Sequence, residues 1–138
     1  MTSATLEALN ELLAAYAFTR DAGLHVTELG DGWCELVVPY SSASERPGGI
    51  LAGSLVMHAA DVAFWCAIKT RLGMEDASVT SGMTTAFLEP ARREDLTCRA
   101  EVLKVGRRLV YGVAECRASR RLVAHHTLTY ARREGGGS

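Results

Sequence analysis

The sequence lacks long apolar runs and a basic start, and each absence argues against a class of protein. The longest apolar stretch, residues 55–68, falls short of the ~20 residues of a membrane-spanning helix and is interrupted by His58 and Asp61. The N-terminal region carries the acidic residues Glu7 and Glu11 and no basic segment, which argues against a secretory signal. We therefore expect a cytoplasmic protein that does not associate with membranes.

The sequence also lacks close pairs of cysteines and has few lysines. The cysteines stand singly, without the close pairs of zinc and redox motifs, and we expect buried free thiols at Cys34, Cys66, Cys98 and Cys116. No trio of side chains has the spacing of a metal site, so no metal ion is expected. Lys69 and Lys104 are the only lysines among many arginines, which is typical of a GC-rich bacterial source.

Charge is nearly balanced overall, at −1, but it is uneven along the chain. Residues 1–89 carry 4 basic and 11 acidic side chains, a net −7, whereas residues 90–138 carry 11 basic and 5 acidic ones, a net +6. The asymmetry indicates either a basic patch for an anionic ligand or charged strand faces in water. Nucleic acid is not an expected partner, because the basic half has no binding motif and few stacking aromatics.

The chain does contain enough apolar sequence for one buried core. Hydrophobic residues make up 48% of its 138 residues and charged residues 22%, as in an ordinary globular protein. We expect a single domain over residues 1–134. The end, Gly-Gly-Gly-Ser at residues 135–138, is expected to be a flexible tail.

Hydrophobic periodicity predicts two helices and six strands. Leucines at helical spacing mark the first helix, Asp31-Gly32 favours a tight hairpin turn, and residues 96–103 alternate between apolar and polar. The expected helices cover residues 4–18 and 53–72, and the expected strands cover 24–30, 33–39, 78–88, 96–103, 109–116 and 122–130, with an irregular loop over 41–49. This order predicts an α+β fold in which an antiparallel sheet curls around a central helix.

The helix expected over residues 53–72 is apolar on nearly every side, so we expect it to be buried on every side. Asp61 lies in its middle, flanked by alanine and valine. An unpaired carboxylate in such a place would cost several kcal/mol, so it is retained either for a structural hydrogen bond or for chemistry. In the second case it acts as a general base toward water or as a nucleophile.

The start of the same helix offers a second chemical group. Free backbone N–H groups near Gly53, at the positive end of the helix dipole, can hold a developing oxyanion. Eight helical residues separate Gly53 from Asp61 by ~12 Å, so one chain does not bring both to a single carbonyl. An antiparallel dimer would place Gly53 of one subunit opposite Asp61 of the other, which predicts an active site shared between subunits.

Four stretches, taken in order, resemble one known family. They are Arg46-Pro-Gly-Gly-Ile-Leu-Ala-Gly-Ser-Leu-Val-Met-His-Ala-Ala-Asp61, Val79-Thr-Ser-Gly-Met-Thr-Thr-Ala-Phe-Leu-Glu-Pro-Ala91, Val105-Gly-Arg-Arg-Leu109 and Leu122-Val-Ala124. Together they look like the phenylacetate-pathway type of hotdog thioesterase, over about residues 20–132. The resemblance implies the hotdog fold, an antiparallel β-sheet wrapped around a central α-helix, and an acyl-CoA substrate.

The resemblance also implies roles for individual residues. Asp61 activates water or attacks the thioester, while the N–H of Gly53 in the partner subunit polarises the carbonyl. Thr80 falls where the family often keeps a Ser or Thr that helps to place the water. The chain departs from the family at the helix start, where the usual His-Gly-Gly reads Ala52-Gly53-Ser54 and the preceding Asn reads Arg46.

Three residues on or before the central helix each have two possible roles. Arg46 either holds a substrate carboxylate or phosphate or lies in solvent on its loop. His58 precedes Asp61 by three positions and shares its helix face; it is either a core histidine bonded to a backbone carbonyl or a base or hydrogen-bond partner for Asp61. Ser54 either caps the helix or contacts the substrate.

Other candidate binding residues lie on the helix and in a turn. Trp65 is expected to line either the core or the acyl pocket. Arg107 and Arg108, in the turn after Gly106, have planar guanidinium groups that suit the phosphates of coenzyme A, although a surface hairpin can carry two arginines without any ligand.

The expected function is hydrolysis of a small or aromatic acyl-CoA by a homodimer or a dimer of dimers, with no cofactor beyond the coenzyme A of the substrate. Two alternatives stay open. A hotdog dehydratase or other acyl-thioester lyase would depend on a catalytic histidine, so His58→Ala would abolish its activity. A non-catalytic protein that binds acyl-CoA or an aromatic ligand would bind without turnover.

Overall fold

The computed structural model describes residues 2–133, so the expected tail at 135–138 lies outside the described residues. The helices are α1 (Leu6–Ala15), α2 (Ala17–Arg20) and α3 (Gly53–Leu72), with one 3₁₀ turn, η1 (Ser42–Ser44). The strands are β1 (His25–Gly30), β2 (Trp33–Val38), β3 (Glu45–Arg46), β4 (Ile50–Leu51), β5 (Val79–Phe87), β6 (Leu96–Val105), β7 (Leu109–Ala118) and β8 (Arg121–Ala131).

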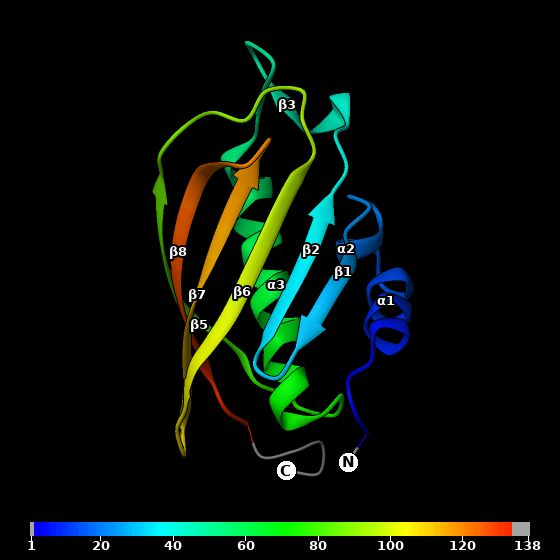
Figure 1. Ribbon diagram of the computed structural model, residues 1–138, viewed down its shortest axis with the longest axis vertical. Helices are drawn as coiled ribbons and strands as arrows, with labels where there is room; N and C mark the ends of the chain where they lie inside the picture. Colours follow the sequence, from blue (N-terminus) through cyan, green and yellow to red (C-terminus); the bar gives the residue numbers. More distant parts are fainter. Residues whose placement is uncertain (1, 134–138) are drawn as a thin grey trace.

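Six strands form one antiparallel sheet that curves around α3. Their order across the sheet is β1-β2-β6-β7-β8-β5, and β3 pairs only with β4 in a separate ribbon. Figure 1 shows α3 running along one face of this sheet, with α1 and α2 beside β1. The predicted α+β hotdog architecture is confirmed, because a single long helix is wrapped by one antiparallel sheet.

Local sequence explains the main elements. In β6, Leu96, Cys98 and Ala100 face α3 and are fully buried, which is the alternation that the sequence predicted. A two-residue turn joins β1 to β2, and Gly32 occupies it with a φ of 82°, a conformation that favours glycine. The inward side chains of the sheet and of α3 form one continuous core.

The expected first helix over residues 4–18 is wrong at its end. The helix stops at Ala15, because Tyr16 adopts an extended backbone with a ψ of 136°, and a second short helix then begins at Ala17. Thr19 explains the break: its buried hydroxyl donates to the carbonyl of Leu13, which in an uninterrupted helix would accept from the N–H of Ala17.

The expectation that α3 is buried on every side is also wrong for a single chain. The sheet covers the side that carries Ala59, Ala63 and Ala67, all fully buried. The opposite side is covered only in part, and its half-buried or exposed side chains are Ser54, Leu55, Met57, His58, Asp61 and Trp65. The physical reason is that one curved sheet can enclose only one side of a helix.

Gly112 tests the fit between the sheet and α3. A Cβ added there would collide with the carbonyl oxygen of Glu101 and the ring of Phe64. We expect Gly112→Ala to lower the free energy of unfolding by about 1–3 kcal/mol, because a packed core cannot accept an added methyl group without moving. Chemical denaturation at one fixed protein concentration would measure the change.

Gly82→Ala is the matched control, since a Cβ at Gly82 would have no atom within 4 Å. Equal stability of the two variants would contradict the tight contact between β7 and α3.

Candidate functional site

Asp61 lies on the partly covered side of α3, with one carboxylate oxygen held and the other open. Thr80 Oγ1 donates to Asp61 Oδ1 at 2.8 Å, and Tyr130 Oη donates to the same oxygen at 2.7 Å. The Tyr130 hydroxyl is also 3.0 Å from the carbonyl oxygen of Asp61. Within residues 2–133 no group donates to Oδ2. The carboxylate is therefore oriented through Oδ1, while Oδ2 can meet a ligand.

The sheet brings both donors to Asp61 from neighbouring strands. Thr80 of β5 pairs with Tyr130 of β8, so their side chains share the face that looks onto α3. A bulge between Thr80 and Gly82 places one extra residue in β5. Without it, Thr80 and the inward-facing Met83 would lie on opposite faces, so the bulge aims Thr80 at Asp61.

Tyr130 is a site residue that the sequence did not single out. Its side chain is buried against Phe64, with ring centroids 5.2 Å apart. Burial raises the pKa of the Tyr130 hydroxyl well above its usual range, and the nearby Asp61 carboxylate raises it further. The hydroxyl therefore keeps its proton and remains a donor. The sequence feature that could have identified Tyr130 is its position in β8, two residues after the inward-facing Leu128 and therefore on the same face of the strand.

A small apolar pocket lies beside Asp61. Its volume is about 210 Å³, and its lining residues are Phe18, Asp61, Val62, Trp65, Ser78, Val79, Thr80 and Tyr130. Of the predicted site residues, the structure therefore brings together Asp61, Thr80 and Trp65. Phe18, from α2, is a second lining residue that sequence analysis missed, since nothing in its local pattern connects it to α3.

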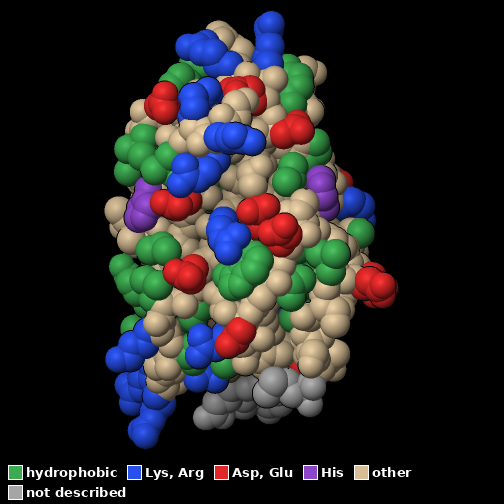
Figure 2. Space-filling view, viewed as in Figure 1, with side chains coloured by type: hydrophobic (Ala, Val, Ile, Leu, Met, Phe, Trp, Pro, Cys, Tyr) green, Lys and Arg blue, Asp and Glu red, His purple; other side chains and the backbone are tan. Residues whose placement is uncertain are grey.

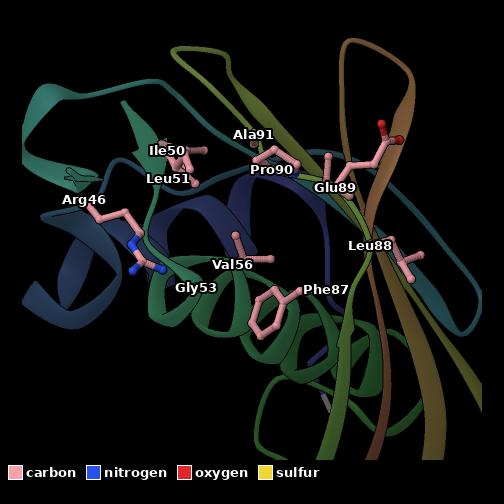
Figure 3. A pocket seen from close by; sticks show the side chains of 11 residues that line it. Arg46, Ile50, Leu51, Gly53, Val56, Phe87, Leu88, Glu89, Pro90 and Ala91 are labelled. Carbon is pink, nitrogen blue, oxygen red and sulfur yellow. The ribbon is translucent and has the colours of Figure 1, made fainter. Parts of the chain in front are cut away.

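Gly53 lies in a different pocket, at the start of α3. This pocket has a volume of about 400 Å³ and is lined by Arg46, Gly53, Phe87 and eight further residues. Figure 3 shows the Arg46 side chain running from β3 toward Gly53, with the Phe87 ring beside the first turn of α3. In one chain, the predicted oxyanion donor and the predicted base thus belong to separate pockets.

The start of α3 carries no side-chain cap. Ala52 is the N-cap residue, so the interpretation of Ser54 as a cap is wrong. The carbonyl of Ala52 accepts from Leu55 and Val56, whereas the N–H groups of Gly53 and Ser54 have no acceptor in the described part of the chain. Two backbone donors at the positive end of a 20-residue helix are therefore available to a ligand.

His58 does not bond to Asp61. Its Nε2 lies 2.6 Å from the carbonyl oxygen of Phe18, as the carbonyl-bonded interpretation expected, but the side chain is half-buried rather than in the core. His58 and Ser54 line a third hollow of about 340 Å³ on the same side of α3.

Arg107 and Arg108 lie at the far end of the sheet from Gly53. They form the exposed turn between β6 and β7, where Figure 2 shows a group of basic side chains at the lower left. Exposed Lys104, Arg132 and Arg133 lie near this turn, and none of the five has an ion-pair partner within residues 2–133. The β6–β7 turn therefore makes this end of the molecule positively charged.

Comparison with known proteins identifies the family. A profile of the thioesterase superfamily matches residues 48–125, which is more than half of the chain. A protein of Saccharolobus solfataricus, described as a candidate esterase, is 31% identical over 102 residues, covering 74% of this chain and 67% of that protein. The chain belongs to the thioesterase superfamily.

Solved structures agree with membership of this superfamily. A thioesterase family protein from Silicibacter pomeroyi is 30% identical with a TM-score of 0.83, covering 89% of this chain and 93% of that one. A Haemophilus influenzae thioesterase is 25% identical with a TM-score of 0.83, covering 92% and 89%. The phenylacetic acid degradation protein PaaI from Thermus thermophilus, 24% identical with a TM-score of 0.78 over 86% and 100%, shares the fold.

Two further searches of residues 2–133 bear on metals and membranes. No three His, Cys, Asp or Glu side chains gather there in a way that would hold a metal ion. No helix in that range is long and apolar enough to cross a membrane.

The hydrogen bond between Tyr130 and Asp61 can be tested without any substrate. We expect a double-mutant cycle of Tyr130→Phe and Asp61→Ala to give a coupling energy of about 1.5–3 kcal/mol, the range for hydrogen bonds to charged groups. Denaturant unfolding of the four proteins at one concentration would measure it. A coupling near zero would contradict the bond and would leave Thr80 as the sole donor to Asp61.

Proposed function

We propose that this member of the thioesterase superfamily hydrolyses the thioester of a small or aromatic acyl-coenzyme A. The observation that carries the proposal is the environment of Asp61: Oδ1 is held by Thr80 and Tyr130, Oδ2 accepts no hydrogen bond within residues 2–133, and the residue lines an apolar pocket of about 210 Å³. A carboxylate with one fixed and one free oxygen, beside space for an acyl group, suits a general base or a nucleophile.

In the base form of the mechanism, Asp61 Oδ2 takes a proton from water while the water oxygen attacks the thioester carbon. The carbonyl oxygen then carries negative charge, which a backbone N–H stabilises. Collapse of the tetrahedral intermediate breaks the C–S bond, and the thiolate of coenzyme A takes the proton held by Asp61. In the nucleophile form, Oδ2 bonds to the carbonyl carbon and the C–S bond breaks, so coenzyme A leaves as a thiolate that takes a proton from solvent and an acyl–Asp61 anhydride forms. Water then attacks the anhydride, which releases the acyl group as its acid, returns the Asp61 carboxylate and gives a proton back to solvent.

The oxyanion donor comes from a second chain in this proposal. Gly53 and Asp61 are eight helical residues apart, ~12 Å along α3, and they line separate pockets. Within residues 2–133 the N–H of Gly53 has no acceptor. A partner subunit that places its Gly53 opposite Asp61 therefore completes a site that neither chain holds alone.

Strand β5 offers the surface for that partner. It is the last strand of the sheet, no other strand in the described part of the chain pairs with its outer edge, and most of its residues are exposed. Thr80, near one end, reaches Asp61, whereas Phe87, at the other end, lies beside Gly53. Antiparallel pairing of two β5 strands about a two-fold axis near Met83 would bring the Thr80 end of one chain to the Phe87 end of the other.

The same pairing gives the basic end a role. Leu109 pairs with Ala131, which pairs with Val79, so the β6–β7 turn lies at the Thr80 end of β5. In a two-fold dimer this end meets the Gly53 end of the partner. Arg107 and Arg108 of one chain are then candidates for the phosphates of coenzyme A, and Arg46, which lines the same pocket as Gly53 of its own chain, is a candidate for an anionic group near that helix start. Whether two such dimers pair further stays a prediction.

Asp61→Asn tests the central claim. We expect thiol release from acyl-CoA to fall by about two orders of magnitude or more, the scale of losing a catalytic acid or base. The assay would use acetyl-, phenylacetyl- and octanoyl-CoA, with wild type and variant matched for folding and oligomeric state. Undiminished turnover in the variant would refute hydrolysis through Asp61, and binding without turnover in the wild type would favour a non-catalytic binder.

Gly53→Pro tests the oxyanion donor, because proline has no backbone N–H. Gly53 is the first residue of α3, a position that tolerates proline, and Ala52 before it has the extended ψ of 135° that proline prefers. We expect kcat to fall about 10²–10³-fold, as for loss of one oxyanion donor. Gly53→Ala is the matched control: it keeps the N–H and adds a Cβ that meets the Phe87 ring at 3.1 Å.

Mixing the two inactive variants tests whether the site is shared. In a mixed dimer of Gly53→Pro and Asp61→Asn chains, one of the two sites would combine an intact Gly53 with an intact Asp61. Equimolar mixing after dissociation should therefore restore about one quarter of wild-type activity, since half of the random dimers are mixed. No recovery, with mixed dimers shown to form, would mean that each site lies within one chain.

A further inference from the structure

An aromatic cluster borders the Asp61 pocket at the break between α1 and α2. The Phe18 ring centroid lies 5.8 Å from that of Trp65 and 6.0 Å from that of His58. Phe18 nevertheless remains 55% exposed. A large apolar side chain left open at the rim of a pocket marks a contact surface for a ligand rather than a core position.

Phe18 is held there through its backbone. His58 Nε2 lies 2.6 Å from the Phe18 carbonyl oxygen, and because a carbonyl can only accept, this nitrogen carries the proton and donates. The next residue, Thr19, is fully buried and bonds to the carbonyl of Leu13. The main chain is therefore fixed at the Phe18 carbonyl and at the next residue, which keeps the Phe18 Cα at the mouth of the pocket.

Several other walls of the pocket are backed by the core. Val62 and Tyr130 are each 3% exposed and belong to the packed interior between α3 and the sheet. Trp65 is held by Lys69, whose Nζ lies 5.0 Å from the ring centroid. Phe18 and Val79 differ from these, because they are 55% and 47% exposed. Val79 belongs to the edge strand β5, so Phe18 is the aromatic wall that can be removed without opening the core.

We infer that Phe18 limits the size of the acyl group that the Asp61 pocket accepts, with His58 as the positioning residue that keeps Phe18 in place. This inference rests on the proposed hydrolysis at Asp61. A short or planar aromatic acyl group would lie between Phe18 and Trp65 in a pocket of about 210 Å³. A long straight chain would meet the Phe18 ring, and each methylene that fails to fit costs about 10–200-fold in kcat/KM.

Phe18→Ala is the direct test, with kcat/KM measured for butyryl-, phenylacetyl- and octanoyl-CoA. We expect the octanoyl-to-butyryl ratio to rise at least ~10-fold, mainly through a lower KM for octanoyl-CoA, because the blocking ring is gone. Tyr16→Ala is the matched control: Tyr16 is also 55% exposed and touches Phe18, but it does not line the pocket. The octanoyl-to-butyryl ratio of kcat/KM for Tyr16→Ala should equal that of wild type.

His58 variants separate positioning from a merely structural role. His58→Ala should shift the ratio in the same direction as Phe18→Ala but by less, and it should add nothing in a Phe18→Ala background. His58→Gln, whose amide can still donate to the Phe18 carbonyl, should restore the wild-type ratio. Thermal midpoints of all variants would confirm that they are folded.

An unchanged ratio in a folded, active Phe18→Ala protein would overturn the inference, as would an equal shift in Tyr16→Ala. A separate result would be wild-type protein with no turnover of any acyl-CoA, or an Asp61→Asn variant as active as wild type. Either of these outcomes would refute the proposed function and the inference together. An unchanged ratio in Phe18→Ala would refute only the inference and would leave hydrolysis at Asp61 intact.

Discussion

The structure depends on the packing of one long apolar helix against one curved sheet. Small side chains on α3, such as Ala59 and Ala63, let the sheet approach the helix closely, and Gly112 makes room for Phe64. The sheet encloses one side of α3, so a boundary runs along the helix between buried and accessible positions. Asp61 lies on that boundary, near enough to the core for a buried tyrosine to hold it and near enough to the surface for a ligand to reach it.

Sequence was enough to predict the elements whose patterns are local. The length of α3, the tight turn at Asp31-Gly32 and the alternation in β6 follow from periodicity and turn chemistry, and the structure places them within a residue or two. Asp61 was identifiable as a candidate site residue because a charge in an apolar helix conflicts with its surroundings. The resemblance to hotdog thioesterases added Thr80, whose bond to Asp61 no local pattern indicates.

The features that sequence missed depend on contacts between distant segments. Tyr130 is 69 residues from Asp61 in the sequence, and its local pattern is that of any inward-facing residue of a strand. Phe18 was assigned to a continuous helix, because the hydrogen bonds of Thr19 that break the helix depend on tertiary packing. The accessible side of α3 was missed for another reason: composition shows that a helix is apolar, but not whether its own chain or a second chain covers it.

The bulge in β5 has a consequence for comparing this chain with its relatives. Seven positions separate Thr80 from Phe87, and one of them, at the bulge, has no counterpart across the ladder on β8. A relative that lacks the bulge would keep the same geometry with a spacing of six. Alignments that count residues would then match its hydroxyl to Ser81, which bonds to the Thr129 carbonyl and not to Asp61. The hydroxyl of a relative that corresponds to Thr80 is identified by the β8 residue with which it pairs. A gap in an alignment of β5 should therefore be placed at the bulge.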